Sequence, residues 1–298
     1  MTGNAPGRAA GLVLAVVGAV VFSGKAIIAK LAYRYGVDPI TLVMLRMLFA
    51  LPVFLVMAWW ASRGQVPLTL RQWGGVLFLG ISGYYLASTL DFLGLLYISA
   101  SLERLILYLN PTLVVILGWL LHRKRISPRH WLAMATSYAG VLMVFGHEVG
   151  AQSAHALLGA ALVFGSAVSY AFYLLYSGRL VQALGSLRLV GLASSVACLL
   201  CIFQFLLLRP LEAGWQVAPE VLWLSLVNAS VCTVVPILLV MLAIERIGAG
   251  ATAQAGMIGP MSTLVMGAWL LGESLTVWVA LGTALVLSGI WMFSRARA

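Results

Sequence analysis

The sequence ISASLERLILYLNP at residues 98–111 has a second copy, IGAGATAQAGMIGP, at residues 247–260. A constant shift of 149 residues, half of the 298-residue chain, aligns the two copies. The alignment continues beyond the prolines and pairs identical residues, namely Gly118 with Gly267, Leu132 with Leu281, Ala135 with Ala284 and Gly140 with Gly289. The chain is therefore interpreted as one duplicated unit, with the first repeat in residues 1–149 and the second in residues 150–298.

The composition is that of an integral membrane protein. Apolar residues make up 62% of the chain and charged residues only 9%, whereas a soluble domain has about 25% charged residues. The net charge of +10 comes from short basic clusters between apolar runs. Membrane orientation explains such clusters better than nucleic-acid binding does.

Ten apolar runs are long enough to cross a membrane. A helix needs roughly 20 mostly apolar residues to span the hydrocarbon core, and the runs are continuous rather than alternating, which argues against a β-barrel. The sequence thus predicts an all-α membrane protein with ten transmembrane helices, at residues 9–32, 39–60, 72–95, 100–121, 129–146, 156–177, 187–208, 220–243, 250–271 and 275–294.

The positions of Lys and Arg predict the orientation. If the N-terminus is cytoplasmic, twelve Lys and Arg residues lie on the cytoplasmic side and four on the outer side or its rim, which is the bias of membrane proteins. Both termini are then cytoplasmic. Because each repeat has five spans, the second is inverted relative to the first. The basic turn HRKR at residues 122–125 accordingly aligns with LGES at residues 271–274, on the opposite side. Inverted repeats are common in secondary transporters, with the substrate site near the midplane.

These features resemble the drug/metabolite transporter superfamily. Asn110-Pro111 and Gly259-Pro260 lie in spans four and nine, GESLT at residues 272–276 is typical of the EamA branch, and so is an early arginine in span two, here Arg46. The first repeat departs from the family by having HRKR in place of the Gly-Glu form.

The resemblance implies an exporter in the inner (plasma) membrane, most similar to the family's amino-acid exporters and in particular to those of aromatic amino acids. Spans one to four and six to nine would wall a central cavity, with spans five and ten peripheral. We expect a secondary transporter that works by alternating access. A broad drug or metabolite carrier stays open as an alternative, and a membrane-embedded lipid-handling enzyme is the weaker one.

Four of the charged residues inside predicted spans are candidates for transport, because a charge there costs roughly 2.5–3.5 kcal/mol on insertion scales and needs a partner, water or a function. Helix rise places all four in the outer third of the membrane. We expect them to line an outward-opening vestibule as cation–carboxylate pairs; the alternative is a closed ion-pair network that only holds the spans together. They are Lys25, Arg46, Asp91 and Glu103.

Polar and aromatic residues supply the other candidates for substrate contact. Tyr84 and Ser88 in span three, and Tyr170 and Tyr173 in span six, combine hydroxyls with rings that suit an amino acid; packing with the hydroxyl on a carbonyl is the alternative. Pro111 and Pro260 break helix hydrogen bonds near the middle of their spans and are hinge candidates, with simple kinked packing as the alternative. Asn110 and Gln254 are the nearest polar side chains.

Small residues recur with a spacing of seven in spans five and ten, at Ala133, Gly140, Gly282 and Gly289. They permit close pairing of the two spans, within one chain or between protomers, so a monomer and a homodimer both stay open.

No cofactor, metal or catalytic activity is expected. The P-loop-like GAVVFSGKA at residues 18–26 has the wrong spacing, and the histidines form no HExxH motif. The expected partners are a small-molecule substrate, an amino acid, and the lipid bilayer.

Overall fold

The computed structural model describes residues 5–123, 126–151, 155–256 and 258–295, and every regular element in these ranges is helical. Seven of the helices are long and apolar enough to cross a membrane. Three predicted spans, 129–146, 250–271 and 275–294, are helical as well but are not among these seven. The prediction of an all-α membrane protein is therefore confirmed.

The elements follow one another with short connections. Polar side chains begin several helices, as Asp38 does for α2, Thr69 for α3 and Ser99 for α5, because each accepts hydrogen bonds from the first backbone N–H groups. The bounds are α1 Ala5–Tyr33, α2 Pro39–Ser62, α3 Leu70–Leu79, the π-helical η1 Gly80–Leu86, α4 Ala87–Gly94, α5 Ala100–Leu107, α6 Asn110–His122, α7 Pro128–Ala151, α8 His155–Leu184, α9 Ser186–Leu208, η2 Leu211–Gly214, α10 Pro219–Ala229, η3 Ser230–Val234, α11 Val235–Gly256, α12 Gly259–Met266, η4 Gly267–Leu271 and α13 Val277–Arg295.

The predicted spans 100–121 and 250–271 are each interrupted where the proline lies. Helix α5 ends at Leu107 and α6 begins at Asn110, while α11 ends at Gly256 and α12 begins at Gly259. In each case proline occupies one of the first two positions of the new helix, where its missing N–H costs nothing. The prolines therefore separate two helices instead of kinking one.

Helix α11 contains the predicted turn between spans eight and nine, although its helical assignment is continuous. Gly11 of α1 lies against Arg246 and Ile247, and Gly18 lies against Leu239. Further along α1, Ser23 donates a hydrogen bond to the carbonyl of Gly259. The chain thus runs antiparallel to α1 as far as Ile247 and then turns back along it. The sequence predicted a loop at residues 244–249. The chain does reverse its direction near these residues, but their backbone stays helical.

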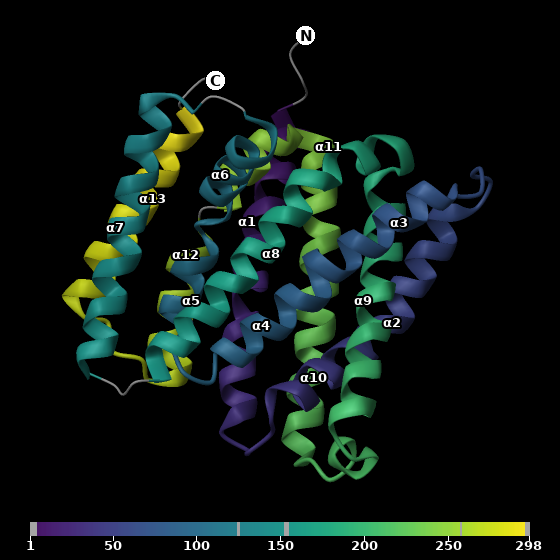
Figure 1. Cartoon of the computed structure of the whole chain (residues 1–298), viewed down its shortest axis with the longest axis horizontal. Helices are drawn as coiled ribbons and strands as arrows, with labels where there is room; N and C mark the ends of the chain where they lie inside the picture. The colour runs from purple at the N-terminus through teal and green to yellow at the C-terminus, as the bar shows by residue number, and fades with distance from the viewer. Residues whose placement is uncertain (1–4, 124–125, 152–154, 257, 296–298) are drawn as a thin grey trace.

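Helix pairing follows a regular pattern across the two halves of the chain (Figure 1). Helix α1 packs along α11, α4 along α8, α2 along α9, α5 against α12, and α7 along α13. The start of α1 and the end of α13 lie at the same end of the bundle, and α7 with α13 forms one side of it (Figure 1). The largest apolar core cluster joins α1, α2, α4 and α9 at the centre.

Small residues bring α7 and α13 into backbone contact within one chain, as their spacing predicted. A Cβ added to Gly140 would lie 2.5 Å from the carbonyl oxygen of Gly282, and one added to Gly289 would lie 2.6 Å from the carbonyl oxygen of Ala133. Neither distance leaves room for a side chain, so these positions fix how closely the two helices approach.

Gly140→Ala is therefore expected to destabilise the protein by about 1–3 kcal/mol, the usual cost of overpacking. The matched control is Gly146→Ala in the same helix, where an added Cβ meets nothing within 4 Å. Alanine is the better helix former by roughly 0.5–1 kcal/mol, so this control should be neutral or more stable. Thermal unfolding in detergent measures both, and equal midpoints for the two variants would contradict the close contact.

Candidate functional site

A buried cluster of charged side chains lies between α1, α2, α4 and α5. The ammonium of Lys25 donates a 2.5 Å hydrogen bond to Oδ2 of Asp91 and lies 3.8 Å from Oε1 of Glu103. The three residues are buried, with exposed fractions of 8%, 1% and 0%. One lysine therefore serves two carboxyl groups from two different helices.

Two arginines complete this charge cluster. Arg46 on α2 is buried, donates to the hydroxyl of Ser88 at 3.0 Å, and lies over the ring of Phe92. Arg104 on α5 is buried as well and donates to the hydroxyl of Thr263 on α12 at 3.1 Å. The cluster thus contains three cationic side chains and two carboxyl groups.

Several polar atoms of the charge cluster have no hydrogen-bond partner. They are Oδ1 of Asp91, both carboxyl oxygens of Glu103, and Nε of Arg46. A buried polar atom without a partner costs about 1–3 kcal/mol, and more when it is charged. Buried polar atoms without a partner need an explanation, and hydrogen bonds to a bound molecule are one.

These contacts confirm that Lys25 and Asp91 form a cation–carboxylate pair, but the expected open vestibule is not formed by them. Burial of Lys25, Arg46, Asp91 and Glu103 makes them a closed network. The reason is that α4 and α5 carry apolar neighbours, such as Phe92, that cover the charges. Arg104 also belongs to this network, although it was not among the candidate residues from the sequence. Its signal was its position next to Glu103 inside an apolar run.

A second cluster is aromatic and lies between η1 and α8. The hydroxyls of Tyr84 and Tyr173 are 3.2 Å apart, and the Tyr170 ring stacks on that of Tyr173 at 5.3 Å between centroids. Gly83 lies directly against Tyr173, so any side chain there would displace the ring. Two of the predicted tyrosines, Tyr84 and Tyr170, are thus neighbours of the third.

The π-helical geometry of η1 is supported by serines of α8. The hydroxyl of Ser169 donates to the carbonyl of Ser82, and that of Ser166 donates to the carbonyl of Ala87, both at 2.7 Å. Both hydroxyls donate to backbone carbonyl groups of the π-helical segment or of the residue that follows it, and π-helical segments often mark functional sites.

One side of η1 and α4 connects the aromatic cluster with the charge cluster. Tyr84, Ser88 and Asp91 are spaced by four and three residues, which places them on one helix face. Tyr84 contacts Tyr173, Ser88 accepts from Arg46, and Asp91 accepts from Lys25. One helix face therefore carries contacts of both clusters, because Tyr84 belongs to the aromatic cluster and Ser88 and Asp91 belong to the charge cluster.

The two helix breaks lie against each other. The hydroxyl of Tyr108, at the end of α5, donates a 2.7 Å hydrogen bond to the carbonyl of Gly256, the last residue of α11. Ser23 on α1 donates to the carbonyl of Gly259 at 2.9 Å. Asn110 is the first residue of α6, and its side-chain oxygen has no hydrogen-bond partner. The predicted Gln254 lies in α11, but its side chain falls outside the described residues.

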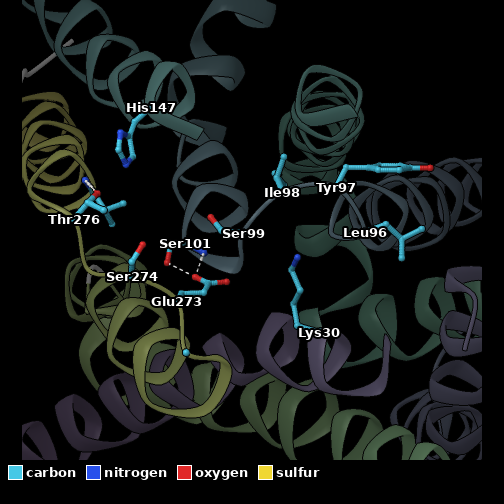
Figure 2. Close-up of a pocket in the computed structure, with 12 residues that line it drawn as sticks. Lys30, Leu96, Tyr97, Ile98, Ser99, Ser101, His147, Glu273, Ser274 and Thr276 are labelled. Atoms are coloured by element: carbon cyan, nitrogen blue, oxygen red, sulfur yellow. Dashed lines mark hydrogen bonds between the residues drawn. The ribbon is translucent and has the colours of Figure 1, made fainter. Parts of the chain in front are cut away.

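A polar pocket of about 390 Å³ opens at the end of the bundle where α5 begins (Figure 2). Lys30 enters it from α1 and His147 from α7, and the loop between η4 and α13 brings Glu273 (Figure 2). Glu273 accepts from the backbone N–H of Ala100 and from the hydroxyl of Ser101, at 2.7 and 2.6 Å. Among the predicted substrate contacts whose side chains the structure describes, none lines this pocket.

Glu273 takes the role of a helix cap supplied from the other half of the chain. Glu273→Ala is expected to lower stability by about 0.5–2 kcal/mol, because the first N–H groups of α5 lose their acceptor. Glu273→Gln keeps one acceptor oxygen and should lose less, and Glu220→Ala, at an exposed position, serves as the control. Thermal unfolding checks the order. An unchanged midpoint for Glu273→Ala would show that water replaces the cap at no cost.

Comparisons with known proteins agree with this architecture. The model of the EamA-like transporter family matches residues 9–146 and again residues 157–295. An uncharacterized transporter of Bacillus subtilis (strain 168), YcbK, is 30% identical over 274 residues, which cover 90% of this chain and 87% of the relative. An uncharacterized transporter of Archaeoglobus fulgidus is 21% identical and covers 91% of this chain and 93% of its own length.

A solved crystal structure has the same fold with little sequence similarity. It superposes with a TM-score of 0.67 at 16% identity and covers 96% of this chain and 99% of its own. The similarity extends over the whole bundle.

Proposed function

Since this chain belongs to the EamA-like transporter family of membrane transporters, we propose that it is a secondary transporter, and not an enzyme, that exports amino acids across the inner (plasma) membrane by alternating access. Aromatic amino acids are proposed to be among its substrates. The observation that carries the proposal is that one side of η1 and α4 presents Tyr84 to the aromatic cluster and Ser88 and Asp91 to the charge cluster. An amino acid carries an ammonium, a carboxylate and a side chain, and the two clusters provide carboxyl groups, cations and rings.

We propose that ten spans form two inverted repeats, residues 1–149 and 150–298, with both termini cytoplasmic. The pattern of helix pairs supports this. Exchanging the halves maps the α1–α11 pair onto the α4–α8 pair and leaves the α2–α9, α5–α12 and α7–α13 pairs unchanged. The two separate matches to the family model agree with the duplication. Reporter fusions at each terminus test the orientation, and a split result would contradict it.

The proposed substrate contacts follow from their position in the two clusters. Lys25 and Asp91 would bind the carboxylate and the ammonium of the substrate, and Ser88 would assist as a hydroxyl held by Arg46. Tyr84, Tyr170 and Tyr173 would receive the side chain, since rings of this kind bind apolar and aromatic groups. Asn110 and Gln254 are proposed at the helix breaks, with Pro111 and Pro260 as hinges. Helices broken in this way are typical of midplane sites in secondary transporters.

Transport by the purified protein in liposomes tests the proposal. We expect saturable, ATP-independent movement of labelled phenylalanine, and competition by other aromatic amino acids, threonine or methionine. Protein-free liposomes are the control. A protein that moves none of these but accepts unrelated drugs or metabolites would instead be the broad carrier that the same family allows.

A further inference from the structure

We propose that the carboxyl group of Glu103 is a coupling site at which a proton and the ammonium group of the exported amino acid replace each other. This inference rests on the proposed function and adds its energy source. Transport would then be an exchange of one inward proton for one outward substrate.

The first argument is the environment of Glu103. Its side chain is fully buried, and neither of its oxygens has a hydrogen-bond partner. The nearest cation, Lys25, makes its short contact with Asp91 and lies 3.8 Å from Glu103. An ionised carboxylate in such a place would lose its hydration without gaining a hydrogen-bond donor from the protein. A proton on Glu103 removes that cost.

The second argument is that a bound proton has a ready acceptor. Lys25 brings Asp91 and Glu103 together, because its ammonium lies 2.5 Å from Oδ2 of Asp91 and 3.8 Å from Oε1 of Glu103, and Oδ1 of Asp91 has no partner. Two ionised carboxylates offer only acceptors, whereas a protonated Glu103 can donate to Asp91. One proton thus gives an oxygen of each residue a hydrogen-bond partner, and Lys25 neutralises the charge that remains on Asp91.

The third argument is the set of groups that surround Glu103. Helices α1, α7, α8, α12 and α13 make the most extensive contacts with α5. Helix α1 contributes Lys25, α4 contributes Asp91, and α5 itself contributes Arg104, whose Nε is bound to Thr263 of α12. Arg46 of α2 lies beyond, at Ser88 and Phe92. Helices α7, α8 and α13 contribute apolar residues, among them Val144, Val163 and Val286.

These charges make proton and substrate compete. With Glu103 protonated, the cluster has three cations and the single anion Asp91, which Lys25 already neutralises. When Glu103 releases its proton, a second anion is available beside Asp91, and the substrate ammonium can bind between the two carboxylates in the proton's place. Electrostatic interactions of this kind are strong where water is excluded.

Protons would reach the site from the polar pocket at the start of α5. Ser99, which caps α5, and Ser101 in its first turn line this pocket, and Glu103 follows about 6 Å beyond Ser99 at the rise of an α-helix. A proton from the outside would enter here, displace the ammonium of the substrate from Glu103, and later leave on the cytoplasmic side.

Accumulation driven by a pH gradient tests the coupling. Liposomes with a lumen one pH unit more acidic than the bath, and with the membrane potential clamped at zero, should accumulate labelled phenylalanine about tenfold, the ratio equivalent to one pH unit. Glu103→Gln, which keeps the shape but cannot ionise, should lose this accumulation. Glu220→Gln, at an exposed position, should keep it. Wild-type transport without any response to the gradient, or an undiminished response in Glu103→Gln, would overturn the proposal.

Infrared difference spectroscopy gives a measurement that needs no substrate. The wild type should show a carboxylic-acid C=O band that disappears at high pH, and Glu103→Gln should lack this band while Glu220→Gln retains it. If phenylalanine is not transported at all, the proposed function fails, while the infrared result still decides whether Glu103 holds a proton. Absence of the band in the wild type overturns the inference on its own.

Discussion

Lys25→Ala is expected to abolish transport and to lower the free energy of unfolding by about 3–5 kcal/mol, the cost of removing one partner of a buried ion pair. The loss is large because Lys25 serves both Asp91 and Glu103. Its removal leaves the short Asp91 contact without a donor in a place with almost no access to water. Thermal unfolding and phenylalanine transport measure the two effects.

A double substitution separates the structural effect from the functional one. Lys25→Met together with Asp91→Leu replaces the pair with apolar groups of similar size, which is often neutral or stabilising for a buried pair. We expect the double variant to regain most of the lost stability and to remain inactive. If it transports phenylalanine normally, the pair only holds α1 and α4 together and is no part of the substrate site.

Much of this architecture was predictable from the sequence, because membrane insertion imposes simple rules. A charge inside a span needs a partner, and this rule predicted the pair of Lys25 with Asp91. The seven-residue spacing of small residues predicted the contact of α7 with α13, where Gly140 lies against Gly282. Helical spacing brought Tyr84 and Ser88 onto the face that also carries Asp91.

Other features depend on tertiary contacts that a single sequence does not contain. The role of Glu273 is one example. Its carboxylate oxygens accept hydrogen bonds from the backbone N–H groups of Ala100 and Ser101, which lie in the other half of the chain. The closed form of the charge cluster is another, since burial of Arg104 depends on Thr263 of α12. Apolar runs show which segments cross the membrane, but they do not show which backbone groups lose their partners at a break.

The contact between the two helix breaks gives the second large effect. Gly259→Ala is expected to slow transport about tenfold, as a change of about 1.4 kcal/mol in a rate barrier would. A Cβ at Gly259 would overlap the hydroxyl of Tyr108. That hydroxyl is the donor to the carbonyl of Gly256, so the added methyl group pushes apart the two ends that this bond joins. Initial rates of phenylalanine transport measure the effect.

Removal of the hydroxyl should reverse part of this loss. Tyr108→Phe alone gives up one hydrogen bond, worth about 0.5–1.5 kcal/mol, but it frees the space that the Cβ of Gly259→Ala needs. The double variant should therefore transport faster than the sum of the two single effects predicts, as expected for residues in direct contact. Gly256→Ala is the matched control, because an added Cβ there meets nothing within 4 Å. Strictly additive effects of the two substitutions would mean that the two helix breaks are not energetically coupled. Each proline would then affect only its own half of the bundle.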